Sequence, residues 1–299
     1  MSATLRTIEN TPTIIEAAIT PYRPGQPLQD SDAMVANAIE CFAAGAGIVH
    51  HHHDFRQERN AAIAQMIDVE SRILAEVPTA LMYGDYLKAK AVTDKMAHLQ
   101  PMADAGVLRM LAIDPGHTMF CGDDSLGRPI RAGVGGTTYG EAHELIDFAK
   151  VVGVPISLGV YEPGQLRWIM AYEHAVAYPA GSVIKIYFGG DYLIDKVASK
   201  GLNVGMPPTL GALDVYSSML EGSNLPWVIS VLGGTILDSP LARRALELGG
   251  NLRVGIEDTA GTTDMTNAET VTAAIALANR VGRPVATTQT ALAALHGAA

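Results

Sequence analysis

Short apolar runs alternate along this chain with longer amphipathic stretches. Eight of the runs show little alternation between apolar and polar positions, which is typical of parallel strands that are covered on both faces. These predicted strands are residues 14–20, 47–52, 79–83, 108–113, 155–160, 183–187, 227–231 and 252–257. Helix start and stop signals lie between them, and helices are predicted from Ser31-Asp32 to Gly45 and over residues 138–152, 239–248 and 267–281.

Eight strands that alternate with helices over about 250 residues match the count of a (β/α)8 TIM barrel. A doubly wound open sheet is the alternative, but its glycine-rich dinucleotide turn is missing after the first predicted strand. The stretch GVGGTTYG lacks the lysine of a phosphate-binding loop, so it is weak evidence for phosphate binding. We therefore predict an α/β fold, a single (β/α)8 barrel domain over residues 1–299 with short N-terminal and C-terminal extensions.

The composition narrows the class of protein. The net charge of −10 argues against a nucleic-acid-binding surface. Two cysteines are too few for a disulfide framework and fit a reducing compartment. The first residues contain no apolar signal core, and no apolar stretch is long enough to span a membrane. We expect a cytoplasmic globular protein that binds neither nucleic acid nor a membrane.

Polar and ionisable residues gather where the predicted strands end. Active sites of (β/α)8 barrels lie at the C-terminal ends of the strands, so this pattern favours an enzyme. Asp85, Asp114 and His117 follow the third and fourth strands and are candidates for substrate binding.

Four consecutive histidines, His50 to His53, end the second predicted strand. Residues two apart on a strand project the same way, so His50 and His52 form one pair and His51 and His53 the other. Such an H-x-H pair can hold a metal ion with its imidazoles, and a catalytic zinc site adds a third protein ligand. The alternative is that these histidines form buried hydrogen bonds. Periodicity alone leaves open which pair faces inward.

Glu257 and Asp258 end the last predicted strand. In a closed barrel the eighth strand neighbours the first, so a side chain there can reach across to the second strand. One carboxylate could bind the metal while its neighbour serves as a base. The alternative is a solvated acidic turn.

These residues resemble the motifs of the β-keto acid cleavage enzymes. "GIVHHHH" is similar to the V-H-x-H strand of that family, and "RVGIED" is similar to its R-V-G-[LF]-E-D strand. "TNAETVTAAIALANRVGRPVAT" resembles the family's ending, and "AAIT", "IDPGHTMF", "VYEPG" and "LELGGNLRVG" follow the same order along the chain.

The resemblance implies a Zn²⁺-dependent acyltransferase that cleaves a β-keto acid with acetyl-CoA as co-substrate, giving acetoacetate and a new acyl-CoA. His50, His52 and Glu257 would be the metal ligands. Asp258 would be the catalytic acid–base residue, and Arg253 would support its charge and position. The resemblance also implies a homo-oligomer, often a tetramer. No separate CoA motif is present, so the CoA component depends on the resemblance alone.

Three positions depart from the family pattern. Gly159 stands where family members often carry an acidic residue, so that polar anchor is absent. Arg23 follows "AAIT", where the family's enzyme for amino substrates has an acid. Arg23 either binds a carboxylate of the substrate or is a surface residue. The first interpretation predicts a substrate whose distal end is not cationic. Lys185 lies among apolar residues of the sixth predicted strand and would contact substrate or pair with Glu162 or Asp191.

Two further interpretations of function stay open. A desolvated Lys185 could form a Schiff base, which would make the protein an aldolase or a related C–C lyase acting on a carboxylate substrate. A metal- or acid-binding barrel without turnover would keep His50, His52 and Glu257 but tolerate the loss of Asp258. His51 or His53 would orient a neighbouring ligand or carboxylate.

Overall fold

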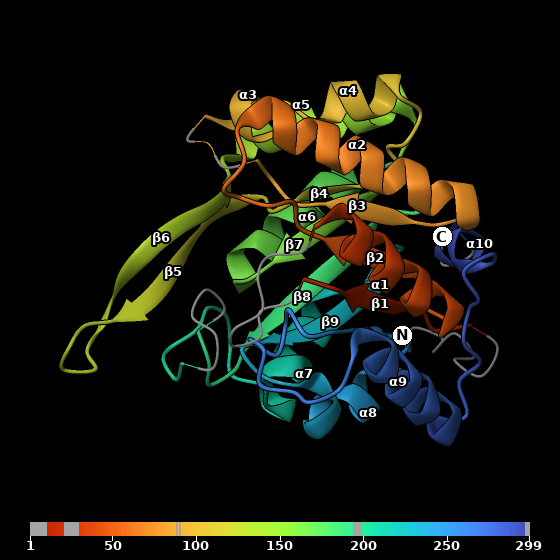
Figure 1. Ribbon diagram of the computed structural model, residues 1–299. Helices are drawn as coiled ribbons and strands as arrows, with labels where there is room; N and C mark the ends of the chain where they lie inside the picture. Colours follow the sequence, from red (N-terminus) through yellow and green to blue (C-terminus); the bar gives the residue numbers. More distant parts are fainter. Residues whose placement is uncertain (1–10, 21–29, 88, 90, 194–198, 297–299) are drawn as a thin grey trace.

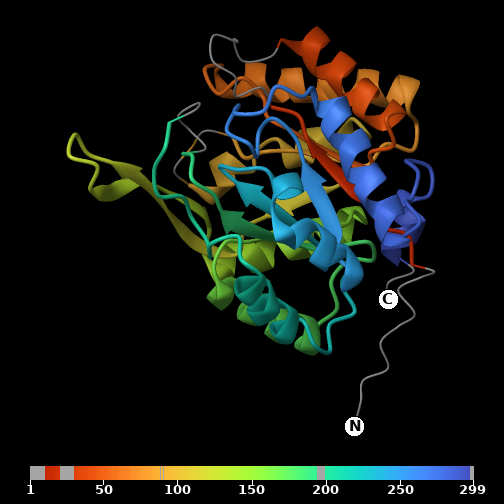
Figure 2. The same cartoon turned by 90° about the horizontal axis from the view of Figure 1, so that it is seen from below.

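Eight parallel strands form a nearly closed barrel with helices on its outside (Figures 1 and 2). This computed structural model describes residues 11–20, 30–87, 89, 91–193 and 199–296. The barrel strands are β1 (Ile15–Ala18), β2 (Ile48–His51), β3 (Met82–Gly84), β4 (Leu111–Ile113), β7 (Ile156–Val160), β8 (Val183–Gly189), β9 (Trp227–Leu232) and β10 (Asn251–Val254). Their order is β3-β2-β1-β10-β9-β8-β7-β4, and the edge strands β3 and β4 contact each other. The predicted (β/α)8 barrel is confirmed.

The helices include the four that the sequence predicts. They are α1 (Ser31–Ala43), α2 (Arg59–Glu76), α3 (Val92–Lys95), α4 (Leu99–Asp104), α5 (Tyr139–Val152), α6 (Pro163–Ala175), α7 (Leu210–Met219), α8 (Pro240–Glu247), α9 (Asn267–Val281), α10 (Ala291–His296) and the 3-10 helix η2 (Ile236–Asp238). Helix α5 begins with a capping box between Thr138 and Glu141, and it ends at Gly153 in the left-handed conformation. None of the helices in the described ranges is both long and apolar enough to cross a membrane.

The inside of the barrel changes from apolar to polar along the strands. Inward positions near the strand starts, among them Ile48, Met110 and Val183, form an apolar cluster. Two and four residues after Ile48 and Val183, the side chains on the same face are polar or ionisable, namely His50, His52, Lys185 and Tyr187, because side chains on a strand alternate with a period of two. The apolar layer therefore closes the N-terminal half of the barrel and leaves a polar site at the C-terminal half.

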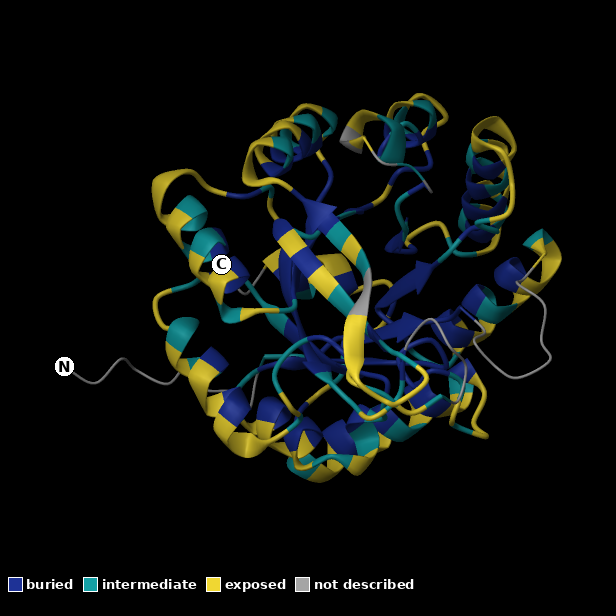
Figure 3. Cartoon of the chain, turned by 90° about the vertical axis from the view of Figure 1, so that its left-hand side faces the viewer, coloured by how far each residue is buried: buried dark blue, intermediate teal, exposed yellow. Residues whose placement is uncertain are grey.

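An antiparallel hairpin, β5 (Gly116–Asp123) and β6 (Pro129–Thr137), projects from the barrel and crosses in front of its C-terminal end (Figures 1 and 3). The eight strands that the sequence predicts do not include this hairpin. Glycine has a low strand propensity, but here it allows close packing. A Cβ on Gly135 would lie 2.5 Å from the Phe120 ring of the partner strand.

Gly255 fixes the turn by which the chain leaves β10 and enters the site. Its φ is +142°, and a Cβ there would overlap the backbone oxygen of Ala18 on β1. Since backbone atoms cannot move aside as a side chain can, we predict that Gly255→Ala lowers the free energy of unfolding by about 3 kcal/mol.

Urea unfolding measures this change. Gly164→Ala is the matched control, because a Cβ at Gly164 on α6 would meet no atom within 4 Å. An equal stability of both variants would contradict the strained role of Gly255.

Candidate active site

A cavity of about 210 Å³ lies at the C-terminal end of the barrel. Residues from several strand ends line it: His50, His52, Phe55, Asp85, Ala112, Asp114, Phe120, Tyr161, Lys185, Tyr187, Leu232, Arg253 and Glu257. Many of them are the inward positions that follow the apolar layer along β2, β4 and β8. The cavity is therefore the polar end of the barrel interior.

Three of these side chains converge on one point. The two Nε2 atoms of His50 and His52 are 2.9 Å apart, and Glu257 Oε1 lies 3.5 Å and 3.4 Å from them, respectively. Two ligands about 2.0–2.1 Å from one tetrahedral zinc ion are themselves roughly 3.3–3.4 Å apart. The other carboxylate oxygen, Glu257 Oε2, is buried and has no hydrogen-bond partner among the described residues. The donor set and its spacing fit a divalent ion.

The protonation of His50 also suits a metal ligand. Its Nδ1 lies 3.2 Å from the Tyr83 carbonyl oxygen, to which it can donate, and this leaves the Nε2 lone pair directed toward His52 and Glu257. Burial lowers the pKa of His50 to about 4, so the imidazole is neutral at pH 7. Burial also lowers the pKa of His52, but the Glu257 and Asp85 carboxylates raise it more, and the net shift is upward.

Arg253 connects the carboxylates at the floor of the cavity. Its Nη2 donates to Glu257 Oε1 at 2.7 Å and to Asp258 Oδ1 at 2.9 Å, and its Nη1 donates to Glu16 Oε1 at 2.9 Å. The side chain is 1% exposed, so its charge is stabilised by these carboxylates rather than by water. Although burial raises the pKa of Glu257, the two histidines and Arg253 hold it well below the usual range.

Asp258 is bound by the Arg253 guanidinium at both of its carboxylate oxygens. Arg253 Nε donates to its Oδ2 at 2.9 Å, and the Ser230 hydroxyl donates to the same oxygen. Asp258 borders a smaller cavity that also contacts Ser230 and Thr259, and it does not line the larger one. Burial raises the pKa of Asp258, with Arg253 opposing the shift.

A buried polar chain crosses the barrel interior beside Arg253. Lys185 Nζ donates to the Tyr83 hydroxyl at 2.5 Å, and that hydroxyl donates to Glu16 Oε1 at 2.5 Å. Lys185 is 3% exposed and lines the cavity, and burial lowers its pKa. Its charged neighbour is Glu16, with an Nζ–Oε1 distance of 3.9 Å, rather than Glu162 or Asp191. Sequence reasoning missed Glu16 and Tyr83, although the lone acid in "IIEAAI" was a visible signal.

The remaining candidates lie in different places. Asp85 and Asp114 line the cavity, and Asp85 Oδ2 is 3.6 Å from His52 Nε2. His117 is exposed on β5 and is absent from the cavity lining, because alternation along the strand turns it away from buried Thr118. Arg23 lies outside the described residues.

The second histidine pair has two separate environments. His51 is buried against α2, where its Nε2 lies 3.1 Å from Glu70 Oε1. His53 packs against the Phe55 ring, with 4.5 Å between ring centroids. Periodicity left open which pair faces inward, and the cavity is lined by His50 and His52.

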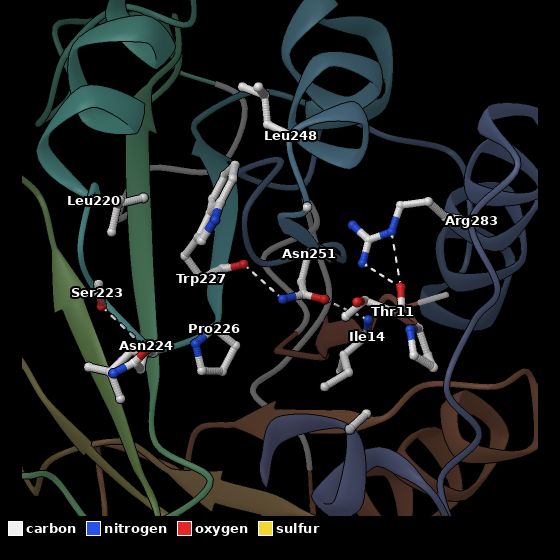
Figure 4. A pocket seen from close by; sticks show the side chains of 14 residues that line it. Thr11, Ile14, Leu220, Ser223, Asn224, Pro226, Trp227, Leu248, Asn251 and Arg283 are labelled. Atoms are coloured by element: carbon white, nitrogen blue, oxygen red, sulfur yellow. Dashed lines mark hydrogen bonds between the residues drawn. The ribbon is translucent and has the colours of Figure 1, made fainter. Parts of the chain in front are cut away.

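A second cavity of about 210 Å³ lies at the opposite end of the barrel (Figure 4). Its polar side chains hold the fold together: Asn251 accepts from the Ile14 amide at 2.8 Å and donates to the Trp227 carbonyl at 2.8 Å. The Arg283 guanidinium donates to carbonyl oxygens of Thr11 and Gly250. These groups are engaged with the backbone, so this cavity offers little for chemistry.

Comparison with known proteins identifies the family of this chain. The family model described as beta-keto acid cleavage enzyme matches residues 12–296. The chain belongs to the β-keto acid cleavage enzyme family. No curated protein sequence matches the chain.

Solved structures share the fold of this family member at low identity. A binary complex of ObcA with oxaloacetate is 14% identical with a TM-score of 0.60, covering 89% of this chain and 66% of that one. A ternary complex of ObcA with a C4-CoA adduct and oxalate is 15% identical with a TM-score of 0.61, covering 86% and 65%. The chain thus spans about two thirds of the ObcA length. Type I 3-dehydroquinate dehydratase from Clostridium difficile is 10% identical with a TM-score of 0.56, covering 91% and 93%.

The convergence of the three side chains predicts one tightly bound divalent ion per chain. We expect Zn²⁺ titration followed by calorimetry to give a stoichiometry of one. His52→Ala should abolish stoichiometric Zn²⁺ binding. Loss of a side chain that only hydrogen-bonds to a metal ligand already costs about 10–100-fold in metal affinity, and loss of a ligand itself costs more.

His117→Ala is the matched control, since that histidine is exposed and outside the cavity lining. Equal Zn²⁺ affinity in the two variants would refute the site.

Proposed function

We propose that this chain is a Zn²⁺-dependent enzyme that cleaves a β-keto acid with acetyl-CoA, giving acetoacetate and a new acyl-CoA. The observation that carries the proposal is the convergence of His50, His52 and Glu257 on one point of a cavity at the barrel's C-terminal end. A bound Zn²⁺ would act there as a Lewis acid toward a carbonyl oxygen. Family membership supports the reaction class.

The residues around the ion have proposed roles. His50, His52 and Glu257 would hold Zn²⁺, and Arg253 keeps the Glu257 carboxylate oriented through its 2.7 Å hydrogen bond. Asp258 is the proposed acid–base residue, fixed and charge-balanced by Arg253. Its raised pKa favours proton exchange, and it reaches substrate if Arg253 yields one of its bonds on binding.

We assign substrate binding to polar side chains that line the same cavity. Lys185 and Arg253 are the cations that line the cavity within the described part of the chain, and we propose that Lys185 attracts the substrate carboxylate. Asp85 and Asp114 would contact its polar groups. The named complexes of ObcA, with oxaloacetate and with a C4-CoA adduct, support a keto acid and a CoA thioester by analogy only.

Several broader assignments remain predictions. These are a single barrel domain over residues 1–299, a homo-oligomer, often a tetramer in the family, and a cytoplasmic location. Arg23 and His117 also keep their predicted substrate contacts as proposals, with His117 exposed outside the cavity.

A Schiff-base lyase is the second candidate function. Lys185 supports it, because this lysine is buried, lines the cavity and has a lowered pKa, as an imine-forming lysine requires. The short hydrogen bond from Lys185 to Tyr83 fits the first proposal better, because it engages the amine that would attack a ketone.

The proposed function predicts turnover of a β-keto acid only when acetyl-CoA is present. Zinc-loaded protein and a panel of β-keto acids should give acetoacetate and acyl-CoA, measured by mass spectrometry. Asp258→Asn should lower kcat by about 10²-fold to 10⁴-fold, because it removes the acid–base group while keeping its shape.

The outcomes separate the candidates. Full activity of Asp258→Asn would remove its acid–base role. Wild-type protein that binds zinc but turns over no keto acid would favour a metal- or acid-binding barrel.

Borohydride trapping tests the lysine mechanism. We expect no covalent adduct when the protein is treated with borohydride and a cleaved keto acid, because the amine of Lys185 does not form an imine in the proposed reaction. Intact-mass spectrometry reads the result, and Lys185→Met is the control. A substrate-dependent mass gain in wild-type protein that Lys185→Met lacks would instead establish the Schiff-base lyase.

A further inference from the structure

An apolar wall forms one side of the active-site cavity. Its members make up one contiguous cluster: Phe120, Tyr161, Tyr187, Val204 and Leu232. All of them except Val204 line the cavity. The Tyr161 and Tyr187 rings stack with 4.8 Å between centroids, and the Phe120 ring meets Tyr161 edge-on at 6.0 Å. These are preferred geometries of aromatic pairs, so the wall is a packed surface rather than a set of separate side chains.

The apolar wall lies across the barrel from the proposed metal ligands. In the strand order of the barrel, β8 is the fourth strand from β2 in either direction. Tyr187 lies on β8, Tyr161 follows β7 and Leu232 ends β9. A β-keto acid whose ketone lies beside His50 on β2 therefore has this wall opposite the part of its chain beyond the ketone.

The β5–β6 hairpin brings Phe120 to the apolar wall. The hairpin crosses in front of the C-terminal end of the barrel (Figure 3), and its pairing register shifts between Phe120 and Cys121. Such β-bulges re-aim side chains and are over-represented beside active sites. The Phe120 ring then rests on the other strand, because a Cβ on Gly135 would lie 2.5 Å from its Cε2. The backbone of β6 thus supports the ring.

One buried glutamine holds the hairpin and the apolar wall together. Gln165 Nε2 donates to Thr118 Oγ1 on β5 at 2.9 Å, and Gln165 Oε1 accepts from the Tyr161 amide at 2.6 Å. Both Gln165 and Thr118 are buried. Tyr161 and Phe120, which lies two residues after Thr118, are therefore positioned by the same side chain.

The apolar wall carries no ionised side chain, because burial raises the pKa of Tyr161 and of Tyr187 well above the usual range. A charged group placed against it would lose hydration without gaining an ion-pair partner from the wall. Asp114 also lines the cavity, but although burial raises its pKa to about 6, Lys185 and Arg253 oppose that shift, so this carboxylate already faces two cations. An apolar group, by contrast, gains free energy by leaving water for such a surface.

We propose that Phe120 is a specificity-determining residue. Together with the rest of the apolar wall it selects β-keto acids that carry an uncharged apolar chain beyond the ketone, and it limits the length of that chain. The ring contacts the chain and takes no part in proton or acyl transfer. This inference rests on the proposed function and adds to it the class of substrate.

Three six-carbon β-keto acids test the chain class in the zinc-loaded full-length enzyme. They are 3-oxohexanoate, which ends in a methyl group, 5-amino-3-oxohexanoate, which carries an ammonium group, and 3-oxoadipate, which ends in a carboxylate. We expect kcat/KM with acetyl-CoA to be at least about tenfold higher for 3-oxohexanoate than for either charged acid, because the wall offers a charge no partner.

Phe120→Ala tests the residue. The ratio of kcat/KM for 3-oxooctanoate to kcat/KM for 3-oxohexanoate should rise at least about tenfold, because the lost ring leaves room for further methylenes and each methylene in an apolar pocket is worth about tenfold or more. A merely structural role would lower both values together, and Phe120→Leu should keep most of the wild-type ratio. Met119→Ala is the matched control and should leave the ratio unchanged, since this neighbour is 53% exposed and does not line the cavity.

Two glycines of β6 give a test that leaves Phe120 in place. Gly135→Ala puts a Cβ against the Phe120 ring and should change the same ratio at least about threefold. Gly133→Ala is its control and should not change the ratio, because a Cβ there would meet no atom within 4 Å.

Calorimetric titration with 3-hydroxyhexanoate and 3-hydroxyoctanoate measures the preference without turnover, because these acids lack the ketone at which cleavage occurs. The ratio of their Kd values should shift toward the longer acid in Phe120→Ala. Thermal unfolding and zinc content are measured for every variant to identify misfolded protein.

Two results would overturn the inference alone: an active wild type that prefers either charged acid, or a folded Phe120→Ala variant whose ratio equals that of the wild type. A wild type that turns over no β-keto acid would instead refute the proposed function, and the Kd values of the hydroxy acids would then decide whether the wall selects an apolar chain.

Discussion

One buried guanidinium organises the active end of this barrel. Arg253 is 1% exposed and binds Glu16, Glu257 and Asp258, which come from β1 and from the turn after β10. A buried cation is tolerated only when carboxylates compensate for lost hydration, and each of these carboxylates needs the cation for the same reason. The positions of Glu257, the proposed metal ligand, and Asp258, the proposed acid–base residue, therefore depend on each other through Arg253.

The barrel explains why such a cluster can exist in a stable protein. Its N-terminal half is filled with apolar side chains, so the polar residues of the C-terminal half rest on a packed layer. Parallel strands place their ends at one face, and this brings His50 on β2 and His52, which follows that strand, within 3.5 Å of Glu257, more than 200 residues later in the chain. The packed core offsets the free-energy cost of burying this charged cluster, and of its members Arg253, Glu257 and Lys185 line the cavity.

Much of this arrangement was predictable from the sequence, and the exceptions have physical reasons. Buried parallel strands are continuous apolar runs, so all eight barrel strands were predictable. Because the C-terminal ends of parallel strands lie at one face of a barrel, the strand ends also predicted that His50, His52 and Glu257 lie close together, and all three line one cavity. The hairpin was missed because its glycines resemble a loop. The orientation of Asp258 was not predictable, because β10 ends at Val254 and the unusual φ of Gly255 redirects the chain before the carboxylates.

X-ray diffraction from zinc-loaded crystals, collected at the zinc absorption edge, tests the account most directly. The account predicts one anomalous peak per chain within about 2.0–2.2 Å of His50 Nε2, His52 Nε2 and a Glu257 oxygen, with Arg253 still bound to that carboxylate. A peak bound elsewhere, or Arg253 turned into the space between the three side chains, would contradict it.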